Sequence, residues 1–166
     1  MNVETLEDLF GDRLQHAYYA ERTHGKLLSE MASDAPTAEL RDRLAAHREE
    51  TDQQIDRLED VFEALERRPR ASRSRAVDGL IESWRQHTQA TDEPAVPGAL
   101  EIALMAERLE IRTYESLLTL AGRLAYADDV VEPLETTLAE ERDTLDDLEA
   151  LETELSVLET IAVDER

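Results

Sequence analysis

The sequence predicts an all-α fold in which four long amphipathic helices form a bundle. Apolar residues recur at spacings of three and four through four long stretches, which is the period of one helix face. The 166 residues include only 5 glycines and 5 prolines, so few positions interrupt a helix. Aromatic residues make up 4% of the chain, which suits Leu- and Ala-rich helix packing better than a sandwich or barrel. We expect one domain that spans 1–166 and buries a single core.

The long helices are placed by their apolar seams and by the breaks between them. Pro36 ends the first seam within a turn at 33–37, because proline cannot continue a helix. Asp128 or Asp129 is expected to cap the last helix, with Pro133 in its first turn. The helices are expected at Val3–Ala32, from the Pro36 turn to about Arg67, at Ala99–Tyr126 and at Val131–Ala162.

Residues 68–98 form a long connection between the second and third of these helices. The connection contains a short amphipathic helix at 76–90 and a break rich in proline at 91–98. A connection of this length can cross the full height of the bundle, so the second and third helices run parallel, as in ferritin-like folds. The basic stretch at 68–75 is expected to sit against the acidic helices of its own chain.

Charge and composition exclude several classes of function. The chain has 40 acidic and 18 basic residues, a formal net charge of −22, which repels nucleic acid and anionic membranes. It has no cysteine, which excludes disulfides, zinc–thiolate sites and iron–sulfur clusters. Lys26 is the single lysine, and this acidic, lysine-poor composition is typical of cytoplasmic proteins of salt-accumulating halophiles. No apolar run is long enough for a membrane span, and the acidic N-terminus is unlike a signal peptide, so we expect a cytoplasmic protein.

The most informative feature is a set of glutamates on the buried seams. Glu21, Glu107, Glu110 and Glu141 each interrupt an apolar stripe near the middle of a predicted helix. A buried carboxylate is costly unless it is neutralised, paired or bound to a metal. Counted along a bundle with the crossover, Glu21, Glu107 and Glu110 agree in depth within about two turns, or ~11 Å. Counted from the opposite end, Glu141 lies about one turn from Glu110. Several carboxylates at one depth are the layout of a di-metal site.

Two histidines are candidates for nitrogen ligands. Glu21 and His24 have the Glu-x-x-His spacing that places a carboxylate and an imidazole on one helix face. His47 lies on the second seam and is read as either a ligand or a boundary residue. The opposing interpretation is structural, because a single seam glutamate often reaches out to solvent and a single core histidine is often only hydrogen-bonded.

Several segments, in order along nearly the whole chain, together resemble one known family. They are Leu6–Phe10 (LEDLF), Tyr18–Glu21 (YYAE), His47–Thr51 (HREET), Arg57–Glu63 (RLEDVFE), Val77–Glu82 (VDGLIE), Ala106–Ile111 (AERLEI) and Thr136–Glu141 (TTLAEE). The sequence resembles the YciE/YciF family of ferritin-like stress proteins. The resemblance implies a four-helix bundle with a crossover helix, usually a dimer, with a di-iron-type centre and a role in stress. The ligand positions that it implies are Glu21, Glu50, Glu107, Glu110 and Glu141.

Two positions depart from the family pattern and leave two functions open. Gln54 stands where the family typically has a histidine, and Leu145 where it typically has an acidic residue. One hypothesis is a stress-associated bundle whose di-metal carboxylate site is partly degenerate. The alternative is a working di-iron or di-manganese oxidase or peroxide-consuming protein, with His24 or His47 supplying nitrogen to two Fe or Mn ions. The sequence leaves the reaction, the substrate and the metal open.

Apolar strips outside the bundle seams predict assembly. The last helix should overhang the third, and its end still carries apolar residues. Leu80, Ile81 and Trp84 form a second strip on the crossover helix. Long apolar strips are seldom left to water, so we expect at least one of the two to be shared in a two-fold homodimer.

Overall fold

A computed structural model describes residues 3–35, 37–90 and 96–164, without the side chains of 89–90, 96–97 and 156–164. Its described residues form five helices and no strand, which confirms the all-α prediction. The helices are α1 (Leu6–Asp34), α2 (Ala38–Ala64), α3 (Arg75–Ala90), α4 (Val96–Leu124) and α5 (Asp128–Asp164). None of them is long and apolar enough to cross a membrane.

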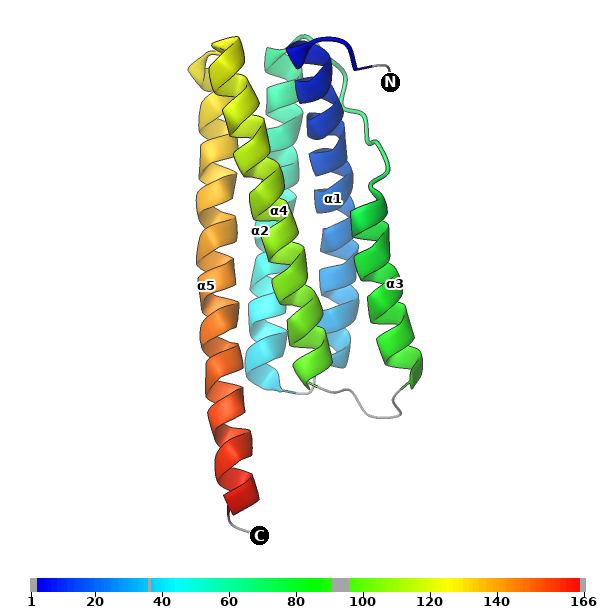
Figure 1. Cartoon of the computed structure of the whole chain (residues 1–166), viewed down its shortest axis with the longest axis vertical. Coiled ribbons are helices and arrows are strands. Elements are labelled where there is room, and N and C mark those ends of the chain that lie inside the picture. Colours follow the sequence, from blue (N-terminus) through cyan, green and yellow to red (C-terminus); the bar gives the residue numbers. More distant parts are fainter. Residues whose placement is uncertain (1–2, 36, 91–95, 165–166) are drawn as a thin grey trace.

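The four long helices form a bundle, and the short α3 lies on its outside (Figure 1). Helix α1 packs on α2 and α4, and α5 packs on the same two helices, so α2 and α4 stand at diagonal corners. Helices α2 and α4 both run upward in Figure 1, because the connection through α3 returns the chain to the lower end. The parallel arrangement and the crossover predicted for a ferritin-like fold are therefore confirmed.

Helix α1 begins later than its apolar pattern predicts. Thr5 is the N-cap: its hydroxyl accepts a hydrogen bond from the N–H of Asp8, and the Asp8 carboxylate accepts one from the N–H of Thr5. This reciprocal capping satisfies two helix-end donors and sets the first turn at Leu6. The spacing of three and four residues from Phe10 predicts Val3 and Leu6 on the buried seam of this helix; they are 44% and 40% exposed, so this prediction is wrong.

Helices α2 and α4 end earlier than predicted, and both ends use the left-handed conformation. Glu66 has φ 54° and Ala125 has φ 51°. After α4, the N–H of Tyr126 bonds to the Ala121 carbonyl and the N–H of Ala125 to that of Gly122. This is the Schellman pattern, which satisfies the last carbonyls of the helix. The predicted ends at Arg67 and Tyr126 are wrong because the chain turns left-handed before them.

The starts of α4 and α5 also differ from the sequence prediction. Helix α4 begins at Val96, so Pro97 and Gly98 lie in its first turn and not in a break; residues 91–95 lie outside the described residues. Helix α5 begins at Asp128, so both aspartates lie inside its first turn instead of capping it. Carboxylates in the first turn are stabilised by the positive end of the helix dipole. Pro133 then falls past the first turn, where it removes one helix hydrogen bond.

The core consists of two apolar clusters separated by a polar layer. One cluster contains Phe10, Leu14, Phe62 and Leu117 and lies near the start of α1. The other contains Leu28, Met31, Leu40 and Trp84 and lies near the end of α1. Between them, all four long helices contribute buried polar side chains: Glu21, His24, His47, Thr51, Gln54, Glu107, Glu110, Thr137 and Glu141.

The crossover helix packs against its own chain. Trp84 is 3% exposed and belongs to the second cluster, with Ile81 packed against it. Two of the three residues of the apolar strip on α3, Ile81 and Trp84, are therefore packed within the chain. Helix α5, by contrast, extends beyond the ends of the other helices (Figure 1).

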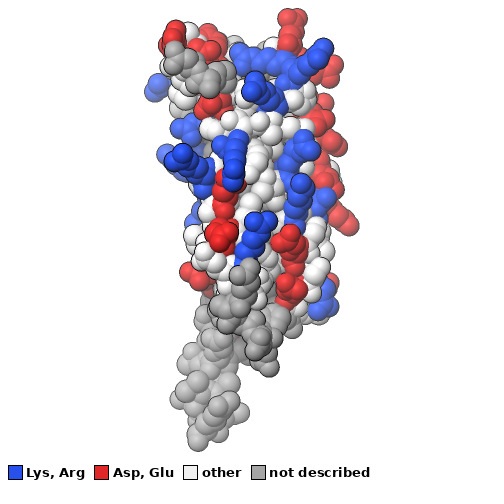
Figure 2. Space-filling view, turned by 90° about the vertical axis from the view of Figure 1, so that its right-hand side faces the viewer, with Lys and Arg blue, Asp and Glu red and all other residues white. Residues whose placement is uncertain are grey.

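Basic side chains gather on the side of the molecule that carries α3. Figure 2 shows this face, where Lys and Arg are prominent although the chain has a net charge of −22. The 68–75 stretch contacts α1, where the Ser72 N–H donates a hydrogen bond of 3.0 Å to the Gln15 carbonyl. Arg73 pairs with Asp78 on α3 at 2.6 Å, and Tyr19 of α1 donates to the same carboxylate.

Candidate metal centre

Glutamate and histidine side chains meet in the middle of the bundle, where no solvent screens them. Glu21, Glu107 and Glu141 are 1%, 0% and 0% exposed, and His24 and His47 are 4% and 5% exposed. Each lies at the point where the apolar seam of its helix turns polar. Burying several carboxylates without compensation costs many kcal/mol, so the layer needs protons, cationic partners or metal ions.

The first group joins α1, α2 and α4. It consists of His24, His47, Glu107 and Glu110, each offering one ligand atom within 4.8 Å of the others. The Nδ1 atom of His24 lies 2.7 Å from Oε2 of Glu110, and its Nε2 lies 3.8 Å from Oε1 of Glu107. The Nε2 atom of His47 lies 3.1 Å from the same Glu107 oxygen without the alignment of a hydrogen bond. Glu107 thus faces both imidazoles.

The second group consists of carboxylates alone and joins α1, α4 and α5. Glu21, Glu110 and Glu141 offer ligand oxygens within 4.8 Å of one another. The hydroxyl of Tyr114 donates a hydrogen bond of 2.5 Å to Oε1 of Glu21, which holds that carboxylate in place. Because Glu110 belongs to both groups, the two groups are adjacent and share one carboxylate.

The donor atoms that face this space fit a pair of metal ions. Several buried polar atoms have no hydrogen-bond partner among the described residues: Glu21 Oε2, His24 Nε2, His47 Nε2, both carboxylate oxygens of Glu107 and both of Glu141. Buried polar atoms are nearly always satisfied, so such a convergence calls for a ligand. Carboxylate oxygens with imidazole nitrogens are the donors that Fe and Mn accept.

Burial and mutual repulsion shift the protonation of the carboxylates. Burial, followed by the charge of Glu110, raises the pKa of Glu21 well above 4.5. Burial, followed by the charges of Glu110 and Glu107, does the same to the pKa of Glu141. Burial alone would raise the pKa of Glu107, but the adjacent His47 outweighs it and lowers the pKa below 4.5. The surroundings therefore favour the protonated form of Glu21 and Glu141 and the ionised form of Glu107.

At the two imidazoles, burial and the charges of neighbouring carboxylates shift the pKa in opposite directions. Burial alone would lower the pKa of His24, but the carboxylates of Glu110 and Glu107 outweigh it and raise the pKa above 6.5. Burial is likewise outweighed at His47, where Glu107 and Glu50 raise the pKa well above 6.5. In the metal-free protein, protons on these groups supply the positive charge that a metal ion would otherwise bring.

Glu50 lies at the edge of the layer and not inside either group. Its side chain is 35% exposed, and Oε2 lies 3.4 Å from Nδ1 of His47 and 3.4 Å from Oγ1 of Thr144. A carboxylate on Nδ1 orients the imidazole so that Nε2 points inward, as outer carboxylates commonly do for metal-bound histidines. Of the seven candidate ligands named from sequence, the structure leaves Glu50 beside the layer and brings together the other six: Glu21, His24, His47, Glu107, Glu110 and Glu141.

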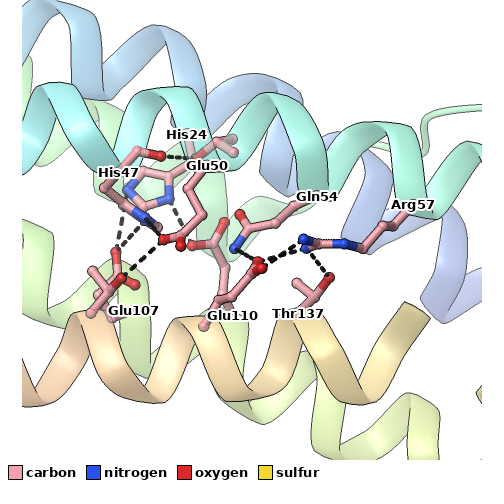
Figure 3. Close-up of polar contacts among 11 residues, drawn as sticks. His24, His47, Glu50, Gln54, Arg57, Glu107, Glu110 and Thr137 are labelled. Carbon is pink, nitrogen blue, oxygen red and sulfur yellow. Dashed lines mark hydrogen bonds and ion pairs between the residues drawn. The ribbon is translucent and has the colours of Figure 1, made fainter. Parts of the chain in front are cut away.

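A row of polar side chains along α2 closes the layer toward α5 (Figure 3). Arg57 binds Glu140 through two contacts of 2.6 Å and donates to Thr137 at 3.3 Å. Gln54, fully buried, donates to the same Glu140 carboxylate at 3.3 Å. Gln54 therefore belongs to the wall that joins α2 to α5 and not to either ligand group.

Two functional positions are clearer in the structure than in the sequence. His47 turns Nε2 toward Glu107, although its seam position also allowed a boundary residue. Tyr114 lies on the same seam as Glu110, and no local signal distinguishes it from an ordinary core aromatic. The sequence does place both residues on apolar seams, which predicts that they are buried. Buried polar atoms need partners inside the bundle.

Four long helices with a crossover, and a buried layer of glutamates and histidines, define a ferritin-like bundle. The sequence profile described as "Domain of unknown function (DUF892)" matches residues 5–160. The chain is 34% identical over 148 residues to protein YciF of Escherichia coli K12, covering 87% of this chain and 88% of that one. The chain therefore belongs to the YciE/YciF family, as its segments predict.

Solved structures agree with this assignment. The crystal structure of the E. coli stress protein YciF superimposes with a TM-score of 0.83 at 31% identity, covering 90% of this chain and 95% of that one. YcfI from Rhodopseudomonas palustris superimposes with a TM-score of 0.84 at 34% identity, covering 89% of this chain and 95% of that one. The fold of this chain is thus shared with both solved structures over most of their length.

Proposed function

We propose that this protein is a stress-associated ferritin-like protein that binds two Fe or Mn ions in its core. The observation that carries the proposal is the position of Glu110, which is shared by a histidine-containing group and an all-carboxylate group. One ion would be held by His24, His47, Glu107 and Glu110, and the second by Glu21, Glu110 and Glu141. Glu110 would bridge them.

Charge supports two divalent ions better than one. The layer contains the carboxylates of Glu21, Glu107, Glu110 and Glu141, which carry four negative charges when ionised. Two divalent cations supply four positive charges, so the loaded layer is neutral inside an apolar core. A single divalent ion would leave two of the four negative charges to be neutralised by protons. Each carboxylate oxygen that takes a proton is lost as a metal ligand.

Bound Fe or Mn would supply redox chemistry toward oxygen or peroxide, which fits a role in stress. The residues of this chain provide the surroundings for that chemistry. Tyr114 holds Glu21 through its short hydrogen bond, and Glu50 orients His47. The apolar clusters on both sides of the layer keep bulk water away from the ions.

The test is metal content. Protein loaded anaerobically with Fe(II), or with Mn(II), should retain close to two equivalents after desalting, and its melting temperature should rise. Glu107→Gln should retain only about one equivalent, because Glu107 belongs to the histidine-containing group alone and faces both of its imidazoles. Glu101→Gln is the matched control, since Glu101 is exposed on the same helix. Wild-type protein that retains no metal, with an unchanged melting temperature, would contradict the proposal.

Two residues favour a second function, that of a bundle whose centre no longer turns over. Gln54 donates its amide N–H to Glu140, and Leu145 packs against the apolar cluster, so the first position lacks the imidazole and the second the carboxylate of the family pattern. The two functions separate in one assay: loaded protein that consumes peroxide or oxygen faster than free ions is an oxidase or peroxidase, and loaded protein without such activity is a structural metalloprotein.

A further inference from the structure

A groove between α2 and α5 leads from the surface to the edge of the metal centre. Its volume is about 290 Å³, enough for several water molecules. Its walls include Arg43, Ala46 and Glu50 from α2 and Glu140, Asp143 and Asp147 from α5, and His47 also lines it. His47 is 5% exposed and turns Nδ1 to Glu50 of the groove and Nε2 to Glu107 of the core, so the groove ends on a candidate ligand of the first group.

The groove carries more negative than positive charge. Asp143 is exposed and has no ion-pair partner in the described part of the chain. Asp147 pairs with Arg43 at 3.1 Å, and Glu140 is neutralised by Arg57. A cleft lined by one sign of charge concentrates ions of the opposite sign and raises their association rate. Here the excess of carboxylates favours cations.

Glu50 stands between the groove and the core. Its contacts to His47 and Thr144 are both 3.4 Å long and both use Oε2, so the carboxylate is held loosely. On the inner side, Nε2 of His47 lies 3.1 Å from Glu107. Glu50, His47 and Glu107 thus follow one another from the groove to the layer, with 3.4 Å and 3.1 Å between neighbours.

The opposite side of the layer is unsuited to an ion. A second pocket reaches His24 and Glu110 between α1, α3 and α4. Its other walls are apolar, among them Leu27, Val77 and Ile81, and its volume is about 10 Å³. A cavity of this size holds at most one water molecule. A hydrated divalent cation would have to shed its water against hydrocarbon there, which is far costlier than exchange onto carboxylates.

We infer that the groove between α2 and α5 is the route by which divalent cations reach the metal centre, with Asp143 and Asp147 collecting the ion and Glu50 passing it to His47. The inference rests on the proposed function, because it assigns an access path to that same site. It also gives a role to Glu50, which the family pattern suggests as a ligand but which lies outside both ligand groups.

The test separates the rate of loading from the amount loaded. Mn(II) uptake by metal-free protein is followed through the loss of the EPR signal of the free ion, and release is followed in excess chelator. Asp143→Asn/Asp147→Asn should slow uptake about fivefold or more at low salt and much less in molar KCl. Arg43→Gln should speed uptake, because it removes the cation that pairs with Asp147. Final metal content should equal that of the wild type in both.

Two further variants control for global charge and for blockage. Asp146→Asn/Glu152→Gln removes two charges from exposed positions of α5 outside the groove, so it changes net charge equally and should leave the rate unchanged. Ala46→Trp fills the groove from an exposed position and should slow uptake and release together, with an unchanged dissociation constant.

The outcomes are distinct. Slower uptake in the Asp143/Asp147 variant, with the control double variant unaffected, supports the route. Equal slowing in both double variants, or unchanged rates in the Asp143/Asp147 and Ala46 variants, would overturn it while the proposed metal site stands. A wild-type protein that takes up no Mn(II) would overturn the proposed site and the route with it.

Discussion

The imidazole of His24 and the carboxylate of Glu110 are 86 residues apart in sequence, and their Nδ1 and Oε2 atoms lie 2.7 Å apart in the core. Glu110 also lies within ligand distance of Glu21 and Glu141. One carboxylate therefore connects the imidazole side of the layer to the carboxylate side, and its loss affects both.

The two groups predict different losses of metal. Glu110→Gln should abolish binding of both ions, because it removes the shared ligand. Glu141→Gln should lose only the ion of the carboxylate group and keep close to one equivalent on His24, His47, Glu107 and Glu110. Elemental analysis after desalting measures this difference. Equal metal content in the two variants would contradict the bridging position of Glu110.

The metal-free protein should lose stability as pH rises from about 5 to about 8. Glu21 and Glu141 have pKa values raised well above 4.5, so the folded state holds protons that the unfolded state releases in this range. The raised pKa values of His24 and His47 act in the same direction: their stabilisation is complete below pH 6.5 and is lost as pH rises through the folded values. The pKa of Glu107 is lowered below 4.5, so its contribution to stability changes only below pH 4.5, outside this range.

Denaturant unfolding of metal-free protein at several pH values measures this slope. Glu141→Gln should weaken it and should be more stable than the wild type near pH 8, because glutamine resembles the protonated acid. Glu101→Gln should keep the wild-type slope. Saturating Mn(II) should reverse the trend, since metal binding requires the ligands to release protons. Metal-free stability that is flat or rising over this range would count against the buried acid layer.

The left-handed residue after α4 predicts a stabilising substitution. Ala125 has φ 51°, a conformation that costs a residue with a side chain about 1–2 kcal/mol. Glycine adopts it freely but loses more entropy on folding, about 0.5–1 kcal/mol. Ala125→Gly should therefore raise the free energy of unfolding by about 0.5–1 kcal/mol. Gly122→Ala is the converse substitution inside α4. It should also raise the free energy of unfolding, because alanine is favoured over glycine within a helix. A destabilised Ala125→Gly would argue against the Schellman end.

The homodimer expected from sequence remains a prediction. On α3, Trp84 and Ile81 pack into the second apolar cluster of their own chain, whereas α5 extends past the other helices. We expect light scattering in high salt to give about twice 18.8 kDa, with the interface at the end of α5. Leu158→Glu/Ile161→Glu should return the mass to that of a monomer. A wild-type mass of 18.8 kDa would refute the dimer.

The sequence by itself determined the helices, the crossover and the depth at which the seams turn polar. Each of these depends on a local rule: helix periodicity marks the buried face, proline marks the turn at residue 36, and the length of the 68–98 connection requires α2 and α4 to run parallel. Glu21, His24, Glu107, Glu110 and Glu141 could be named because each breaks an apolar pattern that is visible within a few turns of its own helix.

Only the tertiary structure decided which of these side chains share a space. Counting along the helices left Glu141 about one turn from Glu110, yet packing brings their oxygens within 4.8 Å. His47 and Glu50 lie one turn apart on α2: the apolar seam favours His47 for the core, whereas the family resemblance names Glu50 as a ligand. The packing of the helices buries His47 and leaves the Glu50 side chain 35% exposed in the groove. Periodicity specifies a face about 100° wide, and the contacts between helices select the residue within it.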